Sequence, residues 1–265
     1  MIVNDGKRNG NTLNITDKNK DRDTSLQWRD CSFAISVICF ILGAIIRIAY
    51  CIQYPVQPRD AYTYCLFITQ WEETGEIPDN VYFPLSLWIL KIPFHFFHYD
   101  CMKGGIIINL ILGLLMIIIV INTAKHFFKN NLVLLFSGLL VATHPTLVSF
   151  SCSFLRENTY LLFSLLALTC LVHYYRKIQC LYLLLTGLFG AFAFLCRLES
   201  FELLPIVCII LFFLCFFKRI RLPKAFLHGL AFSVIFIITV LSLFYCFDFR
   251  IISPNIIMEK IIWSY

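Results

Sequence analysis

Charged residues are scarce in this sequence. Only 14% of its 265 residues are Asp, Glu, Lys or Arg, whereas a typical soluble domain contains about 25%. Hydrophobic residues make up 59% and occur in apolar runs of about 20 residues, the length of a helix that crosses a bilayer. This composition excludes a soluble globular domain. It predicts an all-α integral membrane protein, a polytopic transmembrane helical bundle.

Several chemical signatures are missing. There is no glycine-rich phosphate loop and no dinucleotide fingerprint, which argues against a soluble nucleotide sugar bound in a Rossmann-type domain. The twelve cysteines form no CxxC pair and no Cys/His metal spacing, and most are expected to be small buried hydrophobes. We therefore assign no metal ligands, and the need for a divalent metal stays open. The net charge of +6 is read as orientation charge, so no nucleic-acid partner is expected.

The apolar runs predict seven spans and one membrane domain, residues 31–247. Residues 1–30 mix charges with Asn, Thr, Gly and Ser. They lack the apolar core of a signal peptide, and we expect a disordered tail. Residues 248–265 are interpreted as the start of a further outer loop or as a truncated end. The predicted spans are Cys31–Ile52, Gly105–Ala124, Leu132–Ser151, Asn158–Tyr175, Leu181–Leu195, Phe201–Phe217 and Ala225–Phe247.

The loop charges predict the orientation. With the N-terminal tail in the cytoplasm, the cytoplasmic loops that follow it contain eight Lys or Arg residues and no Asp or Glu. This asymmetry matches the excess of basic residues in cytoplasmic loops of membrane proteins. We expect an integral protein of a bacterial inner or plasma membrane, with its functional site on the outer face.

Residues 53–103 are predicted to form a long outer connection. Two prolines, Pro55 and Pro58, end the first helix. The stretch from Asp60 to Thr74 has a helical apolar period typical of a helix in the membrane interface, and Gly75 ends it. Pro84–Tyr99 is apolar but too short for a span, so we expect a re-entrant or interfacial segment.

Two polar residues in the spans have competing interpretations. Arg47, near the end of the first span, is expected to extend to the interface, with contact to an anionic ligand as the alternative. His144 precedes Pro145, and the pair predicts a proline kink with a hydrogen-bonded histidine rather than a ligand-binding one.

The predicted topology brings four charged segments to the outer face. They are the stretch around Asp60, the turn with Arg156 and Glu157, the turn with Arg197, Glu199 and Glu202, and the tail from Asp248. A guanidinium binds phosphate in bidentate geometry, and a carboxylate takes the proton from an incoming hydroxyl. Such a set suits the transfer of a group from a phosphate. The alternative is that each turn is merely solvated or contacts lipid headgroups.

The order of these segments resembles the GT-C-type membrane glycosyltransferases, in the branch of the protein O-mannosyltransferases and the aminoarabinose transferases. The resemblance covers about residues 31–247. The chain is shorter than is usual in that family. The matching motifs are Pro58-Arg59-Asp60-Ala61-Tyr62, Trp71, Gly75, Phe83-Pro84-Leu85, His144-Pro145-Thr146-Leu147-Val148-Ser149-Phe150-Ser151, Leu155-Arg156-Glu157, Gly187-Leu188 and Phe194-Leu195-Cys196-Arg197-Leu198-Glu199.

The resemblance implies an inverting transfer of a sugar from a polyprenyl-phosphate donor to a hydroxyl acceptor on a protein, glycan or lipid. Asp60 would be the general base, and Glu157, where many relatives carry Asp, a second essential acid. Donor phosphate or substrate would be bound by Arg59, Tyr62, His144, Arg156, Arg197 and Glu199. The alternatives are a multi-span transporter or lipid flippase, and a non-catalytic fragment of a larger transferase.

Overall fold

A computed structural model describes residues 12–76, 84–95 and 100–246, and every regular element in these ranges is helical. The all-α prediction is therefore confirmed. Residues 1–11, 77–83, 96–99 and 247–265 lie outside the described residues, and with them the predicted outer loop at 248–265. The helices are α1 Thr12–Gln53, α2 Arg59–Thr74, α3 Pro84–Lys91, η1 Ile92–His95, α4 Cys101–Ala124, α5 Asn131–Thr143, α6 Pro145–Ser151, α7 Glu157–Lys177, α8 Cys180–Cys196, η2 Leu198–Glu202, α9 Leu203–Phe216 and α10 Leu222–Cys246.

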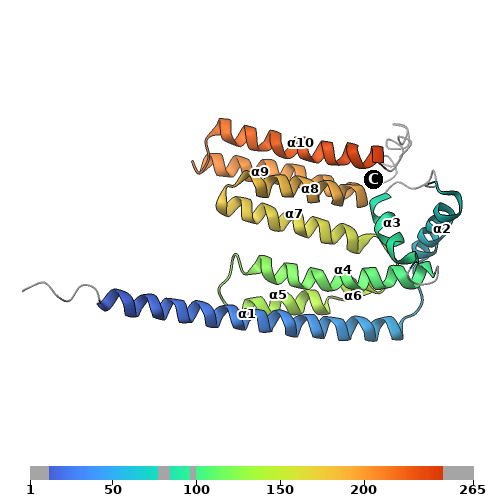
Figure 1. Ribbon diagram of the computed structural model, residues 1–265, viewed down its shortest axis with the longest axis horizontal. Helices are drawn as coiled ribbons and strands as arrows, with labels where there is room; N and C mark the ends of the chain where they lie inside the picture. Colours follow the sequence, from blue (N-terminus) through green and yellow to red (C-terminus); the bar gives the residue numbers. More distant parts are fainter. Residues whose placement is uncertain (1–11, 77–83, 96–99, 247–265) are drawn as a thin grey trace, which may run out of the picture.

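The long helices run side by side, and α2 and α3 lie across one end of them (Figure 1). The described part of each of the seven predicted spans is almost entirely helical, and Leu132–Ser151 is divided between α5 and α6. Four segments within the described residues are long and apolar enough to cross a membrane: Cys31–Gln53, Cys101–Ala124, Leu198–Phe216 and Leu222–Leu243. The bent pair α5 and α6 makes a fifth if it counts as one span. The protein is thus a polytopic helical membrane protein, and the count of seven stays a prediction.

Helix α1 begins at Thr12, within the segment 1–30 that was expected to be a disordered tail (Figure 1). Starting a helix is costly, but extending one is not. The apolar span supplies the nucleus, and no Gly or Pro interrupts residues 12–30. The polar segment therefore continues the helix beyond the bundle.

The predicted proline kink is present. Helices α5 and α6 are separated at His144 and bent by 54°. Pro145 has no backbone N–H, so the carbonyl of Val141, four residues earlier, cannot make its usual helical hydrogen bond. The His144 side chain itself is exposed, so the expected hydrogen-bonded histidine is not observed.

The interpretation of Arg47 as an interfacial residue is wrong, because its side chain is fully buried. Its guanidinium donates to the carbonyls of Val141 at 3.2 Å and Ala142 at 3.0 Å, and to Ser151 Oγ at 3.1 Å. Val141 and Ala142 are in the last turn of α5, where a cation is favourable. Arg47 therefore satisfies the carbonyls that the proline break leaves open.

Helices α2 and α3 close one end of the bundle through a shared apolar cluster. Ala61 and Ile68 of α2, Leu87 and Leu90 of α3, and Phe154 are all buried together. The predicted helix from Asp60 to Thr74 is confirmed as α2. Gly75 ends it with φ +73°, a left-handed conformation that glycine adopts at little cost.

Candidate active site

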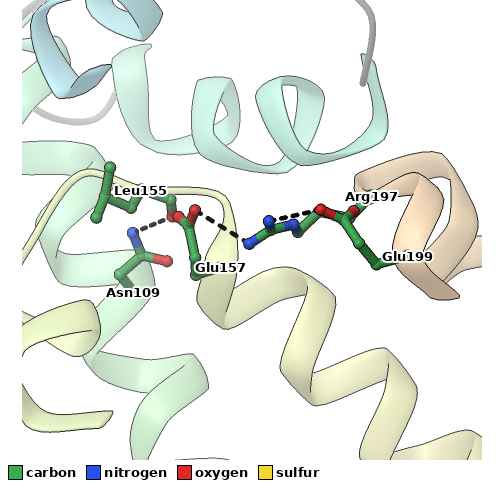
Figure 2. A network of polar contacts seen from close by, with 5 residues as sticks. All are labelled: Asn109, Leu155, Glu157, Arg197 and Glu199. Atoms are coloured by element: carbon green, nitrogen blue, oxygen red, sulfur yellow. Dashed lines mark hydrogen bonds and ion pairs between the residues drawn. The ribbon is translucent and has the colours of Figure 1, made fainter. Parts of the chain in front are cut away.

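The loop between α6 and α7 is held by buried amide side chains. Asn109 of α4 is fully buried, and its Nδ2 donates to the Ser153 carbonyl at 2.7 Å. The same Nδ2 donates to the Leu155 carbonyl at 2.8 Å (Figure 2). Asn158 Nδ2 donates to the Asn109 carbonyl at 3.0 Å. These contacts fix the backbone immediately before Glu157, the first residue of α7.

The same loop is tied to the segment before α2. Gln57 Nε2 donates to the Cys152 carbonyl at 3.2 Å, and Gln57 Oε1 accepts from the Phe154 N–H at 2.9 Å. Gln57 lies three residues before Asp60 in the sequence. The α2 segment and the Arg156–Glu157 turn are therefore held together although about a hundred residues separate them.

Arg197 links two carboxylates across the end of the bundle (Figure 2). It follows α8, and its guanidinium lies 3.4 Å from Glu157 Oε1 and 2.7 Å from Glu199 Oε1. It also lies over the ring of Tyr160, with 5.7 Å between Cζ and the ring centroid. Glu157 is at the N-terminus of α7, where the helix dipole favours an anion. The second oxygen of Glu157, Oε2, is buried and makes no hydrogen bond within the described structure.

Arg197, Glu157 and Glu199 form what we name the Arg197 cluster, and Tyr64 of α2 lies within electrostatic range of it. The pKa of its phenol is raised, first by burial, and the charges that act on it belong to Arg156, Glu157, Asp60 and Arg197. One hydroxyl thus lies within electrostatic range of four residues that the sequence analysis selected. Asp60 is one helical turn before Tyr64, so both lie on the same face of α2.

The remaining predicted site residues are less closely associated with the Arg197 cluster. Arg59 is exposed at the start of α2. Tyr62 is 59% exposed. It is two residues from both Asp60 and Tyr64, so it does not share their face of α2. His144 lies at the break between α5 and α6, and none of the hydrogen bonds or ion pairs in the described part of the chain joins it to the Arg197 cluster.

Sequence reasoning missed Gln57, Tyr64, Asn109 and Asn158. Asn109 had a usable signal, since it is the only polar residue with an amide side chain in the apolar run Gly104–Ile121. A polar residue in a span is costly unless it has a partner. Tyr64 shared a helix face with Asp60 at a spacing of four, which is visible in the sequence.

Chemically, the cluster combines a half-buried guanidinium with acids that are only partly paired. Arg197 can bind a phosphate oxygen, and Glu157 and Asp60 can accept a proton from a hydroxyl. In the part of the chain that the structure describes, no three His, Cys, Asp or Glu side chains converge as a metal-ligand set.

Comparison with known proteins gives one family. Residues 79–243, more than half of the chain, match the family model described as dolichyl-phosphate-mannose-protein mannosyltransferase. No curated protein and no solved structure matches significantly. The matched range contains His144, Arg156, Glu157, Arg197 and Glu199, whereas Arg59, Asp60 and Tyr62 precede it.

Proposed function

The chain belongs to the dolichyl-phosphate-mannose-protein mannosyltransferase family, integral-membrane glycosyltransferases of the GT-C type, and we propose that it moves a sugar from a polyprenyl phosphate to a hydroxyl acceptor. The family uses lipid-linked sugar donors and protein or glycan acceptors. In this proposal the transfer occurs on the non-cytoplasmic face, with Asp60 as the general base. The observation that carries it is the Arg197 guanidinium, which lies between Glu157 and Glu199 at the end of the bundle that α2 covers.

The reaction needs a base and a cation close together, and this end of the bundle supplies both. Asp60 accepts the proton of the acceptor hydroxyl, whose oxygen bonds to the anomeric carbon of the sugar. The bond from that carbon to the phosphate oxygen breaks, and the polyprenyl phosphate leaves with the electron pair. Arg197 and Arg156 stabilise the negative charge that the phosphate gains. The anomeric configuration is inverted, because the attack comes from the side opposite the phosphate.

Glu157 has two roles in this scheme. Through Oε1 it holds the Arg197 guanidinium at 3.4 Å, which orients it for the phosphate. Its buried Oε2 has an open acceptor position for a hydroxyl of the sugar or the acceptor. Removing Glu157 therefore weakens both the placement of Arg197 and the contact with substrate.

The transporter alternative required a buried acid in a span. Among the described residues the charged side chain that is fully buried is a base, Arg47. Its hydrogen bonds to the carbonyls of Val141 and Ala142 explain its burial without any transport role. No observation favours this alternative over sugar transfer.

The donor assignment is tested by kinetics in membranes that express the full chain, with a labelled polyprenyl-phosphate mannose as donor. Arg197→Gln is expected to raise the donor KM and lower kcat, with Arg197→Lys intermediate because a point charge cannot bind phosphate in bidentate geometry. Lys103→Gln is the matched control, since it also removes one cation at this end, from an exposed ion pair with Asp100. Equal donor KM values for Arg197→Gln and Lys103→Gln would remove Arg197 from donor binding.

A further inference from the structure

The end of the bundle away from Arg197 contains a second candidate site. Helices α4 and α7 begin near the Arg197 cluster, and their C-terminal ends lie at the opposite end of the bundle (Figure 1). There, with the turn between α9 and α10, they line an open hollow of about 550 Å³, which we name the basic cavity. Its lining residues are His126, His173, Tyr175, Arg176, Lys177 and Arg219.

In the part of the chain whose side chains the structure describes, no ion pair joins Arg176, Lys177 or Arg219 to an acid. No Asp or Glu occurs in residues 101–156, 158–198 or 203–247, the ranges that contain all the residues lining the cavity. Uncompensated like charges that converge on one cavity repel one another. An anion bound in the cavity would relieve this repulsion.

Aromatic rings hold the two arginines in place. The Arg176 guanidinium lies over Phe127, at 6.0 Å from its ring centroid, and that of Arg219 over Tyr175 at 5.1 Å. Such cation–π contacts orient a guanidinium without neutralising its charge. Both side chains are thereby pre-organised for bidentate binding of a phosphate.

The two histidines lie against each other in the basic cavity. Their ring centroids are 4.0 Å apart, and a hydrogen bond of 2.8 Å joins His173 Nδ1 to the Thr169 carbonyl. The pKa of His126 is lowered, first by burial and then by the positive charges of His173, Arg176 and Lys177. These groups therefore lie within electrostatic range of one another.

We propose that the basic cavity binds the phosphate headgroup of an anionic membrane lipid, with Arg176 and Arg219 as its phosphate ligands. A lipid is favoured over a soluble phosphate because exposed aromatic side chains flank the cavity: Phe127, Phe128 and Phe217 are each about half exposed or more. Aromatic residues of this kind mark the depth of the membrane interface, which is where lipid phosphates lie. The site is separate from the Arg197 cluster and does not depend on the proposed reaction.

Lipid binding by the purified full chain tests this proposal. The protein is placed in nanodiscs of phosphatidylcholine with increasing phosphatidic acid, whose headgroup is a phosphate monoester, and bound phosphatidic acid is measured by native mass spectrometry. The variant R176Q/R219Q is compared with K218Q/R221Q, which removes two cations from the same end, at positions that do not line the cavity. Both pairs lose general attraction to anionic lipid. The cavity pair is expected to weaken binding about tenfold more, because it also loses the bidentate contacts.

Two further measurements complete the test. The charge-conserving variant R176K/R219K is expected to bind with intermediate affinity, which separates loss of the phosphate contacts from loss of folding. Equal weakening by R176Q/R219Q and K218Q/R221Q would overturn the proposal in favour of general surface attraction. If inorganic phosphate alone raises the thermal midpoint of the lipid-free protein as much as phosphatidic acid does, the ligand is a free phosphate and the lipid assignment is wrong.

Discussion

Replacing Asn109 by Ala is expected to destabilise the protein by about 1–3 kcal/mol and to reduce sugar transfer. The change removes a buried hydrogen bond of 2.7 Å to the Ser153 carbonyl and a partly buried one of 2.8 Å to the Leu155 carbonyl. The Ser153 carbonyl keeps the Leu155 N–H as a donor at 2.9 Å, so the cost of about 1–3 kcal/mol for a carbonyl left without a donor applies to Leu155. Asn109 Oδ1 is itself buried without a hydrogen-bond partner. Its removal therefore offsets part of the destabilisation.

The assay is equilibrium unfolding in mixed micelles, with Asn122→Ala as control. Asn122 is on the same helix, but its Oδ1 accepts only from the exposed Lys125 ammonium at 3.1 Å, so its loss should cost less than about 0.5 kcal/mol. Sugar transfer should fall for Asn109→Ala alone, because the loop that it holds leads directly into Glu157. If both variants unfold within about 0.5 kcal/mol of each other, the assignment of Asn109 as the support of this loop is wrong.

Two further variants test the backbone features on which the site depends. Arg47→Met should destabilise the protein by about 2–4 kcal/mol in the same unfolding assay, because the Val141 carbonyl loses the donor that replaces the missing Pro145 N–H. A decrease in the free energy of unfolding below about 0.5 kcal/mol would contradict this role. Gly75→Ala should cost about 1 kcal/mol, because φ is +73° there and nothing lies close enough to clash. Gly75→Asn should cost less, and a reversed order of the two Gly75 variants would refute this explanation.

Much of the fold could be predicted from local patterns. The apolar runs predicted the segments that are helical in the structure. Gly75 predicted the end of α2, and Pro145 predicted the bend between α5 and α6. These predictions succeed because a bilayer requires each segment to satisfy its backbone hydrogen bonds internally. Length and composition alone leave the exact span count open, since α8 has only 17 residues.

What could not be predicted depends on contacts between residues far apart in the sequence. Arg47 looked interfacial because nothing near it shows that Pro145, 98 positions later, frees a carbonyl for it to bind. The supporting roles of Gln57 and Asn109 depend likewise on loop carbonyls about 45–100 residues away. The tail helix was missed because composition alone does not show that an adjacent span can nucleate it.

The sequence predicted that the segments of Asp60, Glu157 and Arg197 lie together. In the structure an ion pair joins Glu157 to Arg197, and Gln57, three residues before Asp60, is hydrogen-bonded to the loop before Glu157. Their chemical roles remain proposals, since no comparison reaches Asp60. Tyr64, which lies among these residues, was overlooked because a tyrosine in an aromatic-rich interfacial helix is unremarkable by composition.

The most direct test of the proposed reaction is the turnover of labelled polyprenyl-phosphate sugar, at saturating donor, by Asp60→Asn compared with the wild type at equal expression. Glu73→Gln is the matched control, because it also removes one exposed acid from α2. Loss of a general base lowers the rate about 10²–10⁴-fold, so the account predicts a fall of at least about a hundredfold for Asp60→Asn and wild-type turnover for Glu73→Gln. Equal turnover by Asp60→Asn and the wild type would contradict the assignment of Asp60 as the base.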